Sequence, residues 1–190
     1  MSDIIRTFIA VEIPENIVSQ LRRLQNEMKT SGFRARWVRA EGIHLTLKFL
    51  GDIEISEVET VGRVITDLAK SHPSMTLSIR GVGVFPGIRR PRVLWAGISG
   101  ETMPLASLQK ALEARMEIIG FPKEARPFRG HLTLARFRKD GAPESIAAAV
   151  AAYGGFETES FAADAIHLFK SRLTPSGAEY TKLISAPLTG

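Results

Sequence analysis

The chain has 190 residues, and 44% of them are hydrophobic, which is enough to bury a sizeable core. It has no cysteine, so a disulfide framework, a thiolate nucleophile and a cysteine-ligated metal are all excluded. The 25 Lys and Arg residues outnumber the 20 Asp and Glu residues and give a net charge of +5. A modestly basic balance is usual for a solvated surface, but it also suits a phosphate-bearing substrate.

The N-terminal stretch MSDIIRTFIAVEIP contains one short apolar run between Asp3 and Pro14. This pattern is typical of neither a signal peptide nor a membrane span. We therefore expect a soluble, cytoplasmic protein with no membrane partner.

The elements predicted along the chain recur at an offset of 87 residues. A strand is predicted at 4–11, and the offset places it on another predicted strand at 91–98. A helix is predicted after each strand, because apolar residues follow at helical spacing. These residues are Ile17, Leu21, Leu24 and Met28 in the first half and Leu105, Leu108, Leu112 and Met116 in the second.

The segments HLTLKFLG at 44–51 and HLTLARF at 131–137 follow as the second strand of each half. A helix is predicted after each, within 56–72 and 142–154. A third strand is predicted at 75–85 in the first half.

The offset carries that third strand onto 161–171, and a final strand is predicted at about 178–186. The repeat thus covers about 4–85 and 91–171 within a single bilobal domain, residues 1–190. We expect an α+β fold in which two pseudo-twofold-related lobes turn mainly antiparallel sheets toward a central cleft, with the helices outside.

Side chains alternate along a strand, so each histidine shares a face with the threonine two positions on, while the leucines face the core. The two pairs are His44 with Thr46 and His131 with Thr133. The same alternation places Lys48 beside the first pair, where it could assist electrostatically, and Phe49 in the core.

Two imidazoles that titrate near neutrality can divide the work of an in-line displacement at phosphorus. One accepts a proton from the nucleophile, and the other protonates the leaving oxygen. Threonine hydroxyls can stabilise the charge that builds on the phosphate oxygens. A cyclic phosphodiester suits such a site, which needs no cofactor, and no His/Asp/Glu cluster with metal-ligand spacing accompanies the motifs.

A lone histidine on a strand is usually structural, and His72 and His167 are interpreted in that way. The two HLTL segments differ because they recur at the period of a wider repeat. That recurrence favours a paired active site.

The chain resembles the two-histidine (2H) phosphoesterase superfamily, and within it the RNA 2′,3′-cyclic phosphodiesterases, also called 2′-5′ RNA ligases. The resemblance covers nearly the whole chain. The segments that carry it are RTFIAVEIP, HLTLKFLGDI, VGVFPGIRRPRVLWAGI, RPFRGHLTLARF and SRLTPSGAEY. One departure is Gly130, where family members often carry proline.

The resemblance implies hydrolysis of an RNA-terminal 2′,3′-cyclic phosphate to a 2′-phosphomonoester, with reversible 2′-5′ ligation of tRNA-like fragments as a further reaction. It assigns His44 as the proton donor and His131 as the proton acceptor, with Thr46 and Thr133 binding phosphate. Arg136 fits the family pattern and would contact phosphate, but strict alternation turns it away from His131 unless a bulge or the strand end intervenes.

Other readings stay open from sequence alone. The cleft could belong to an RNA- or nucleotide-binding module, or to a phosphodiesterase for another small cyclic phosphate. Arginines Arg89, Arg90 and Arg92 lie in a loop that could follow an RNA backbone or simply be solvated. We expect a monomer whose partner is an RNA end or a cyclic nucleotide.

Overall fold

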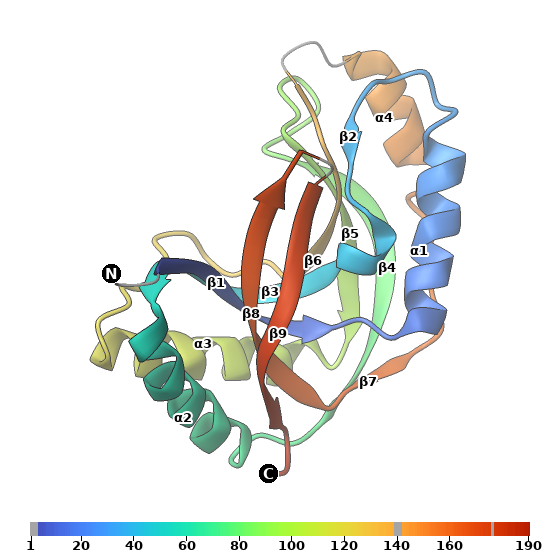
Figure 1. The fold of residues 1–190 in the computed structure, drawn as a ribbon. Helices are drawn as coiled ribbons and strands as arrows, with labels where there is room; N and C mark the ends of the chain where they lie inside the picture. The colour runs from blue at the N-terminus through green and yellow to red at the C-terminus, as the bar shows by residue number, and fades with distance from the viewer. Residues whose placement is uncertain (1–3, 139–141, 176) are drawn as a thin grey trace.

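The computed structural model describes residues 4–138, 142–175 and 177–190 (Figure 1). Its strands are β1 (Ile4–Glu12), β2 (Arg36–Trp37), β3 (His44–Glu54), β4 (Met75–Phe85), β5 (Val93–Gly100), β6 (His131–Arg136), β7 (Phe161–Ala163), β8 (Ala165–Thr174) and β9 (Gly177–Pro187). Its helices are α1 (Glu15–Met28), α2 (Val58–Ala69), α3 (Thr102–Ile118) and α4 (Pro143–Ala152), with short 3-10 turns η1 (Ala40–Gly42) and η2 (Ile55–Glu57).

The strands form two sheets. One has four strands in the order β3-β1-β8-β9, and the other has five in the order β2-β6-β5-β4-β7. Neighbouring strands are antiparallel in both sheets. The predicted α+β fold with antiparallel sheets is confirmed.

The two sheets exchange strands between the halves of the chain. Strand β8, from the second half, pairs with β1, and β4, from the first half, pairs with β5. The strand predicted at 161–171 is interrupted at Asp164, because the residues before it pair with β4 and those after it pair with β1. The sequence pattern therefore found a strand here but missed the crossing from one sheet to the other.

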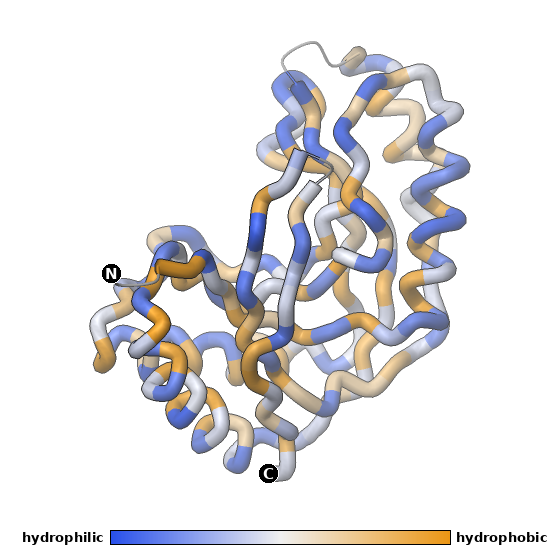
Figure 2. Tube along the Cα trace, viewed as in Figure 1, coloured by the Kyte–Doolittle hydropathy of each residue, from blue (hydrophilic) through white to orange (hydrophobic). Residues whose placement is uncertain are grey.

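The helices cover the outer faces of the sheets (Figure 1). Helices α2 and α3 contact the four-stranded sheet. Helix α1 is tied to the five-stranded sheet by Gln25, whose amide donates to the carbonyls of Leu134 at 2.9 Å and Val38 at 2.8 Å. Hydrophilic and hydrophobic residues alternate along α1 and α2, as expected for helices with one buried face (Figure 2).

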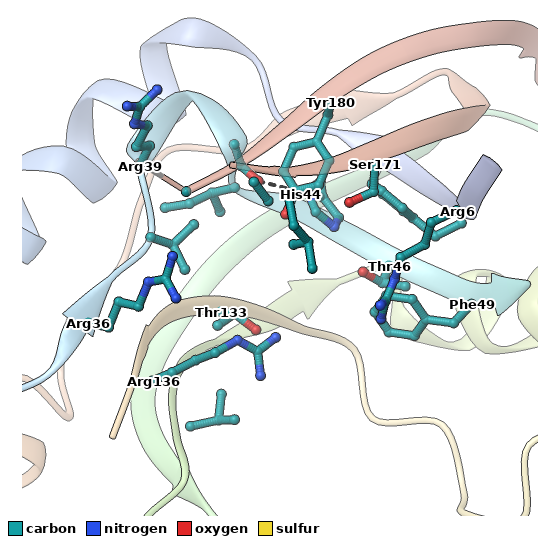
Figure 3. A pocket seen from close by; sticks show the side chains of 18 of the residues that line it. Arg6, Arg36, Arg39, His44, Thr46, Phe49, Thr133, Arg136, Ser171 and Tyr180 are labelled. Carbon is teal, nitrogen blue, oxygen red and sulfur yellow. Dashed lines mark hydrogen bonds between the residues drawn. The ribbon is translucent and has the colours of Figure 1, made fainter. Parts of the chain in front are cut away.

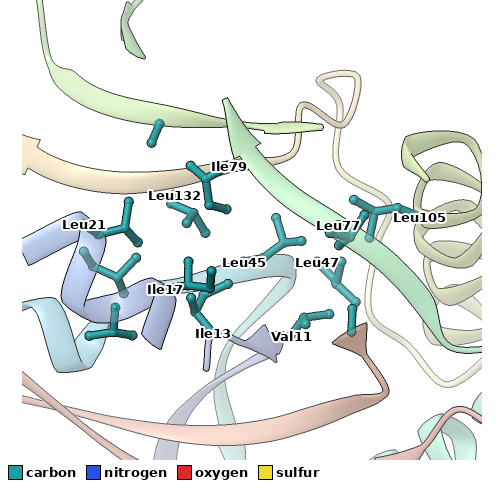
Figure 4. Packing of buried hydrophobic residues seen from close by; sticks show 14 of the residues in the cluster. Val11, Ile13, Ile17, Leu21, Leu45, Leu47, Leu77, Ile79, Leu105 and Leu132 are labelled. Atoms are coloured by element: carbon teal, nitrogen blue, oxygen red, sulfur yellow. The ribbon is translucent and has the colours of Figure 1, made fainter. Parts of the chain in front are cut away.

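The core joins the helices to both sheets and is continuous from one sheet to the other (Figure 4). The apolar positions predicted for α1 and α3 are all buried. The leucines of both HLTL segments join the same core, each no more than 3% exposed: Leu45, Leu47, Leu132 and Leu134. This packing fixes which way each motif faces, because burying the leucines turns the histidine and threonine side chains to the other side.

Candidate active site

Each HLTL strand carries a β-bulge at its second leucine. The β1–β3 ladder passes over Leu47, which lies between Thr46 and Lys48. The β5–β6 ladder passes over Leu134 in the same way. A bulge adds one residue to a strand, so every side chain beyond it faces the side opposite to that expected from simple alternation.

The bulge at Leu47 overturns the two predictions made for the residues that follow it. Lys48 does not line the cleft: it is 2% exposed and its ammonium group donates to the Glu113 carboxylate at 2.7 Å and to the Pro122 carbonyl at 2.8 Å. Phe49, predicted to be in the core, is 55% exposed and lines the cleft. The assignment of Lys48 to phosphate binding was therefore wrong.

The bulge at Leu134 turns Arg136 toward the pocket, whereas the bulge at Leu47 turns Lys48 away from it. Leu134 and Ala135 are both buried, and the next side chain, Arg136, turns outward and lines the same cleft as His131. The condition stated from the sequence, that Arg136 needs a bulge to reach the site, is met. Since Leu47 and Leu134 lie 87 positions apart in the chain, Phe49 and Arg136 occupy equivalent places in the two halves.

A pocket of ≈ 590 Å³ lies between the two HLTL strands. Both His-x-Thr pairs line it: His44 and Thr46 from β3, and His131 and Thr133 from β6. Figure 3 shows Thr46 and Thr133 on facing sides of the pocket, with Arg136 next to Thr133. The duplicated motif thus forms one site in the fold.

The two imidazoles are held by the same local hydrogen bond. The Nδ1 atom of His44 lies 2.8 Å from the Gly42 carbonyl oxygen, and that of His131 lies 2.7 Å from the Arg129 carbonyl oxygen. Because a carbonyl only accepts, each Nδ1 carries the proton. The Nε2 atom of each ring therefore remains for the chemistry.

His44 lies in an aromatic enclosure on the four-stranded sheet. Its ring stacks on Phe8 with centroids 4.5 Å apart, and Tyr180 packs edge-on against it at 5.0 Å. Burial lowers the pKa of His44 to about 4, although the hydrogen bond to Gly42 opposes the shift. Burial also raises the pKa of Tyr180. His44 is consequently neutral at pH 7 in the free protein.

The surroundings of His131 are more open. Among the described residues, the aromatic ring packed against it is that of Phe85, edge-on with centroids 5.1 Å apart. The two histidines therefore share their backbone geometry but differ in how strongly aromatic rings enclose them.

Sequence reasoning did not assign three further arginines to the site. Arg6 on β1, Arg36 on β2 and Arg39 before η1 all line the pocket. Arg36 belongs to the basic segment RARW at 34–37, and nothing in the spacing of this segment connects it to the HLTL motifs. The β2–β6 pairing is what brings it there.

Other candidate residues lie outside the pocket. Arg89 and Arg90 line a separate hollow with Pro86, Gly87 and Ile88. His72 places its Nδ1 atom 3.0 Å from the Leu68 carbonyl at the end of α2. His167 is 6% exposed, and burial lowers its pKa.

Within the described ranges, no group of three or more His, Cys, Asp or Glu side chains is arranged to hold a metal ion. The helices described are also too short or too polar to cross a membrane.

Two halves related by an 87-residue repeat, each with a His-x-Thr pair turned into a shared pocket, define a duplicated α+β protein of the 2H phosphoesterase type. The model of the family described as LigT like Phosphoesterase matches the chain twice, over residues 11–95 and 97–180. The chain belongs to this family.

Similar proteins span nearly the same length. A relative from Methanothermobacter thermautotrophicus, named RNA 2′,3′-cyclic phosphodiesterase, is 31% identical over 94% of this chain and 96% of its own. A relative of the same name from Thermotoga maritima is 29% identical over 97% of this chain and 96% of its own.

Solved structures have the same fold. The crystal structure of TT0787 of Thermus thermophilus superposes with a TM-score of 0.79 at 30% identity, covering 97% of this chain and 98% of that one. The crystal structure of E. coli LigT complexed with 3′-AMP gives a TM-score of 0.80 at 24% identity, covering 99% of this chain and 100% of that one.

Proposed function

We propose that the protein hydrolyses RNA-terminal 2′,3′-cyclic phosphates to 2′-phosphomonoesters. The observation that carries the proposal is the presence of two His-x-Thr pairs in one pocket, each with a free Nε2 atom. The names of the relatives from M. thermautotrophicus and T. maritima support the same substrate class.

In the proposed reaction, His131 and His44 act on opposite sides of the phosphorus. The Nε2 atom of His131 accepts a proton from water as the water oxygen forms a bond to phosphorus. The bond from phosphorus to the 3′ oxygen breaks, and this oxygen takes a proton from Nε2 of His44. The phosphate stays on the 2′ oxygen, and one water molecule has been added across the broken bond.

The charge that develops on the non-bridging phosphate oxygens is stabilised by Thr46, Thr133 and Arg136. The two hydroxyls donate hydrogen bonds, and the guanidinium group provides a fixed positive charge on the side of His131. Transition-state stabilisation then comes from the protein's own donors.

The donor role of His44 requires a second proton on its ring, whereas burial keeps the ring neutral in the free protein. A cyclic phosphodiester is an anion, and a negative charge next to Nε2 favours the imidazolium form. We therefore propose that His44 gains its proton together with the substrate. The aromatic rings of Phe8 and Tyr180 would then hold an imidazolium, which aromatic faces and a bound anion both stabilise.

The same pair of groups serves ligation, in which the 5′ hydroxyl of a second RNA end takes the place of water, the 3′ oxygen leaves with the proton from His44, and a 2′-5′ linkage results. Both pairs come from one chain, so the site is complete without a partner subunit, which supports a monomer. An RNA substrate and a chain free of cysteine both suit the cytoplasm.

The test is to incubate the purified protein in EDTA with an RNA oligonucleotide that ends in a 2′,3′-cyclic phosphate and to identify the position of the product phosphate. We expect a 2′-phosphate. His44→Ala and His131→Ala should each lower kcat by about 100- to 10,000-fold, the usual contribution of a general acid or base. No turnover, or turnover that survives both substitutions, would refute the proposal.

The individual roles are separated by a substrate whose 3′-bridging oxygen is replaced by sulfur. A thiolate leaves without protonation, so loss of the proton donor should no longer matter. We expect His44→Ala to recover most of its activity on this substrate, while His131→Ala does not. Recovery in His131→Ala alone would reverse the two assignments.

A further inference from the structure

Two arginines lie directly opposite each other at the edge of the five-stranded sheet. Arg36 on β2 and Arg136 on β6 are Cα partners in the antiparallel β2–β6 ladder, and both line the pocket. Like charges at directly opposed positions destabilise a pair of strands. This arrangement becomes favourable when an anion lies between the two guanidinium groups.

Neither arginine is neutralised by the protein. Within the described part of the chain, no salt bridge involves Arg36, Arg39 or Arg136, whereas Arg22, Arg63 and Arg172 are each paired with a glutamate. The acidic residue nearest to Arg39 in the sequence, Glu41, is occupied by Arg22 at 2.8 Å. Arg36, Arg39 and Arg136 therefore bring three unpaired positive charges to this end of the pocket, while Arg6 brings one to the other end.

A terminal cyclic phosphate carries a single negative charge. In the proposed reaction, Arg136 and the two threonines already stabilise this charge. Arg36 and Arg39 lie beyond them at one end of the pocket, away from Arg6 and Phe49 (Figure 3). They add two charges that the reacting phosphate does not require. An RNA end has its next phosphate on the 5′ oxygen of the terminal nucleoside.

We propose that Arg36 and Arg39 form a second anion subsite that binds this 5′ phosphate, with Arg136 between it and the reacting group. The inference rests on the proposed function, because it places the substrate by its cyclic end. It implies that the protein distinguishes an RNA end from a 2′,3′-cyclic mononucleotide that has no 5′ phosphate. The RNA chain would leave the pocket past β2. The terminal base then lies toward Phe49.

The experiment compares three substrates: a 2′,3′-cyclic mononucleotide, the same compound with a 5′-phosphate, and a dinucleotide with a terminal cyclic phosphate. The wild-type kcat/KM should be at least tenfold higher for the two that carry a 5′ phosphate group, since hydrogen bonds between charged groups are strong. In Arg36→Gln/Arg39→Gln this ratio should fall toward one. The slope of log kcat/KM against log salt for the dinucleotide should decrease by roughly 0.7, because one phosphate contact is lost.

The matched control is Arg89→Gln/Arg90→Gln, which removes the same charge from a hollow outside the pocket and should keep the wild-type ratio. Arg36 and Arg39 are exposed, so their replacement should not lower the denaturant midpoint. Equal loss on all three substrates, or an equal effect of the control, would overturn the second subsite. Absence of turnover on all three by the wild type would instead refute the proposed function.

If Arg36→Gln/Arg39→Gln lowers kcat/KM for the dinucleotide alone, the subsite binds an internal phosphodiester. If this variant also lowers kcat/KM for the 5′-phosphorylated mononucleotide, the subsite binds a single phosphate group. Both results support the subsite and identify which source of phosphate it takes.

Discussion

The two halves of the pocket have the same backbone design and different side chains. Both have a histidine held through Nδ1 by the carbonyl two residues earlier and a bulge at the second leucine. The pairs His44/His131 and Thr46/Thr133 are identical residues at equivalent positions of the repeat. At the next equivalent position that lines the pocket, the first half has Phe49 and the second half has Arg136. The repeat thus duplicates the geometry of the His-x-Thr pair, while the neighbouring side chains make the site asymmetric.

This asymmetry matters because the substrate itself has no twofold symmetry. A nucleotide has an apolar base on one side of its phosphate and, in an RNA strand, a further anion on the other. The pocket is asymmetric in a similar way, with the exposed Phe49 ring beside Arg6 at one end and Arg36 and Arg39 at the other.

The largest difference between the halves in stability should come from the residue after each bulge. Lys48 is buried with Glu113, and its counterpart in the repeat is Ala135. Lys48→Met should lower the free energy of unfolding by about 3–5 kcal/mol, because it leaves a buried carboxylate without its partner. Denaturant titration measures this loss.

The double variant Lys48→Met/Glu113→Gln should recover a large part of that loss, since no uncompensated charge remains. Lys110→Met, at an exposed site on α3, is the control and should change stability little. A small loss in Lys48→Met would mean that the charge at this position does not hold β3 against α3.

A second contrast is in the pH dependence of stability. His44 has a pKa of about 4 in the folded protein, against the ordinary histidine value of 6.5 in an unfolded chain. Between these values the unfolded chain binds a proton that the folded protein does not, so stability should fall as pH is lowered from 6.5 to 4. The fall amounts to up to about 3 kcal/mol, at 1.36 kcal/mol for each pKa unit.

Denaturant titrations at pH 7.5 and 4.5 would measure this fall as the difference between wild type and His44→Gln. The variant should lose less stability at the lower pH. His131→Gln retains His44 and should behave like wild type in this comparison. Equal losses in wild type and His44→Gln would show that the aromatic enclosure does not exclude the charged ring.

The smallest effect is expected at the divergent pair, Phe49 and Arg136. Phe49→Ala should raise KM by roughly tenfold, consistent with the loss of base stacking, with little change in kcat. Phe49→Tyr is the control and should preserve KM. Arg136→Gln should instead lower kcat, because its charge acts on the transition state. If Phe49→Ala and Arg136→Gln both changed KM alone, the prediction that one residue contacts the base and the other the reacting phosphate would be wrong.

The sequence was sufficient to predict the shared site because the repeat and the buried leucines specify it together. It failed at Lys48 and Phe49 because a bulge is determined by the partner strand and not by local alternation. The repeat held a clue: a bulge that brings Arg136 to the site implies the same bulge 87 residues earlier. Arg36 was missed because the two-residue strand β2 places it, and the pairing of that strand is a tertiary contact.

The exchange of strands between the sheets limits how the two repeats can move. The β1–β8 and β4–β5 ladders each join one half of the chain to the other, so neither repeat completes a sheet with its own strands. Drawing the repeats apart would break backbone hydrogen bonds inside both sheets at once. His44 on β3 and His131 on β6 lie in different sheets, so their spacing depends on the core that joins the two sheets and not on these ladders.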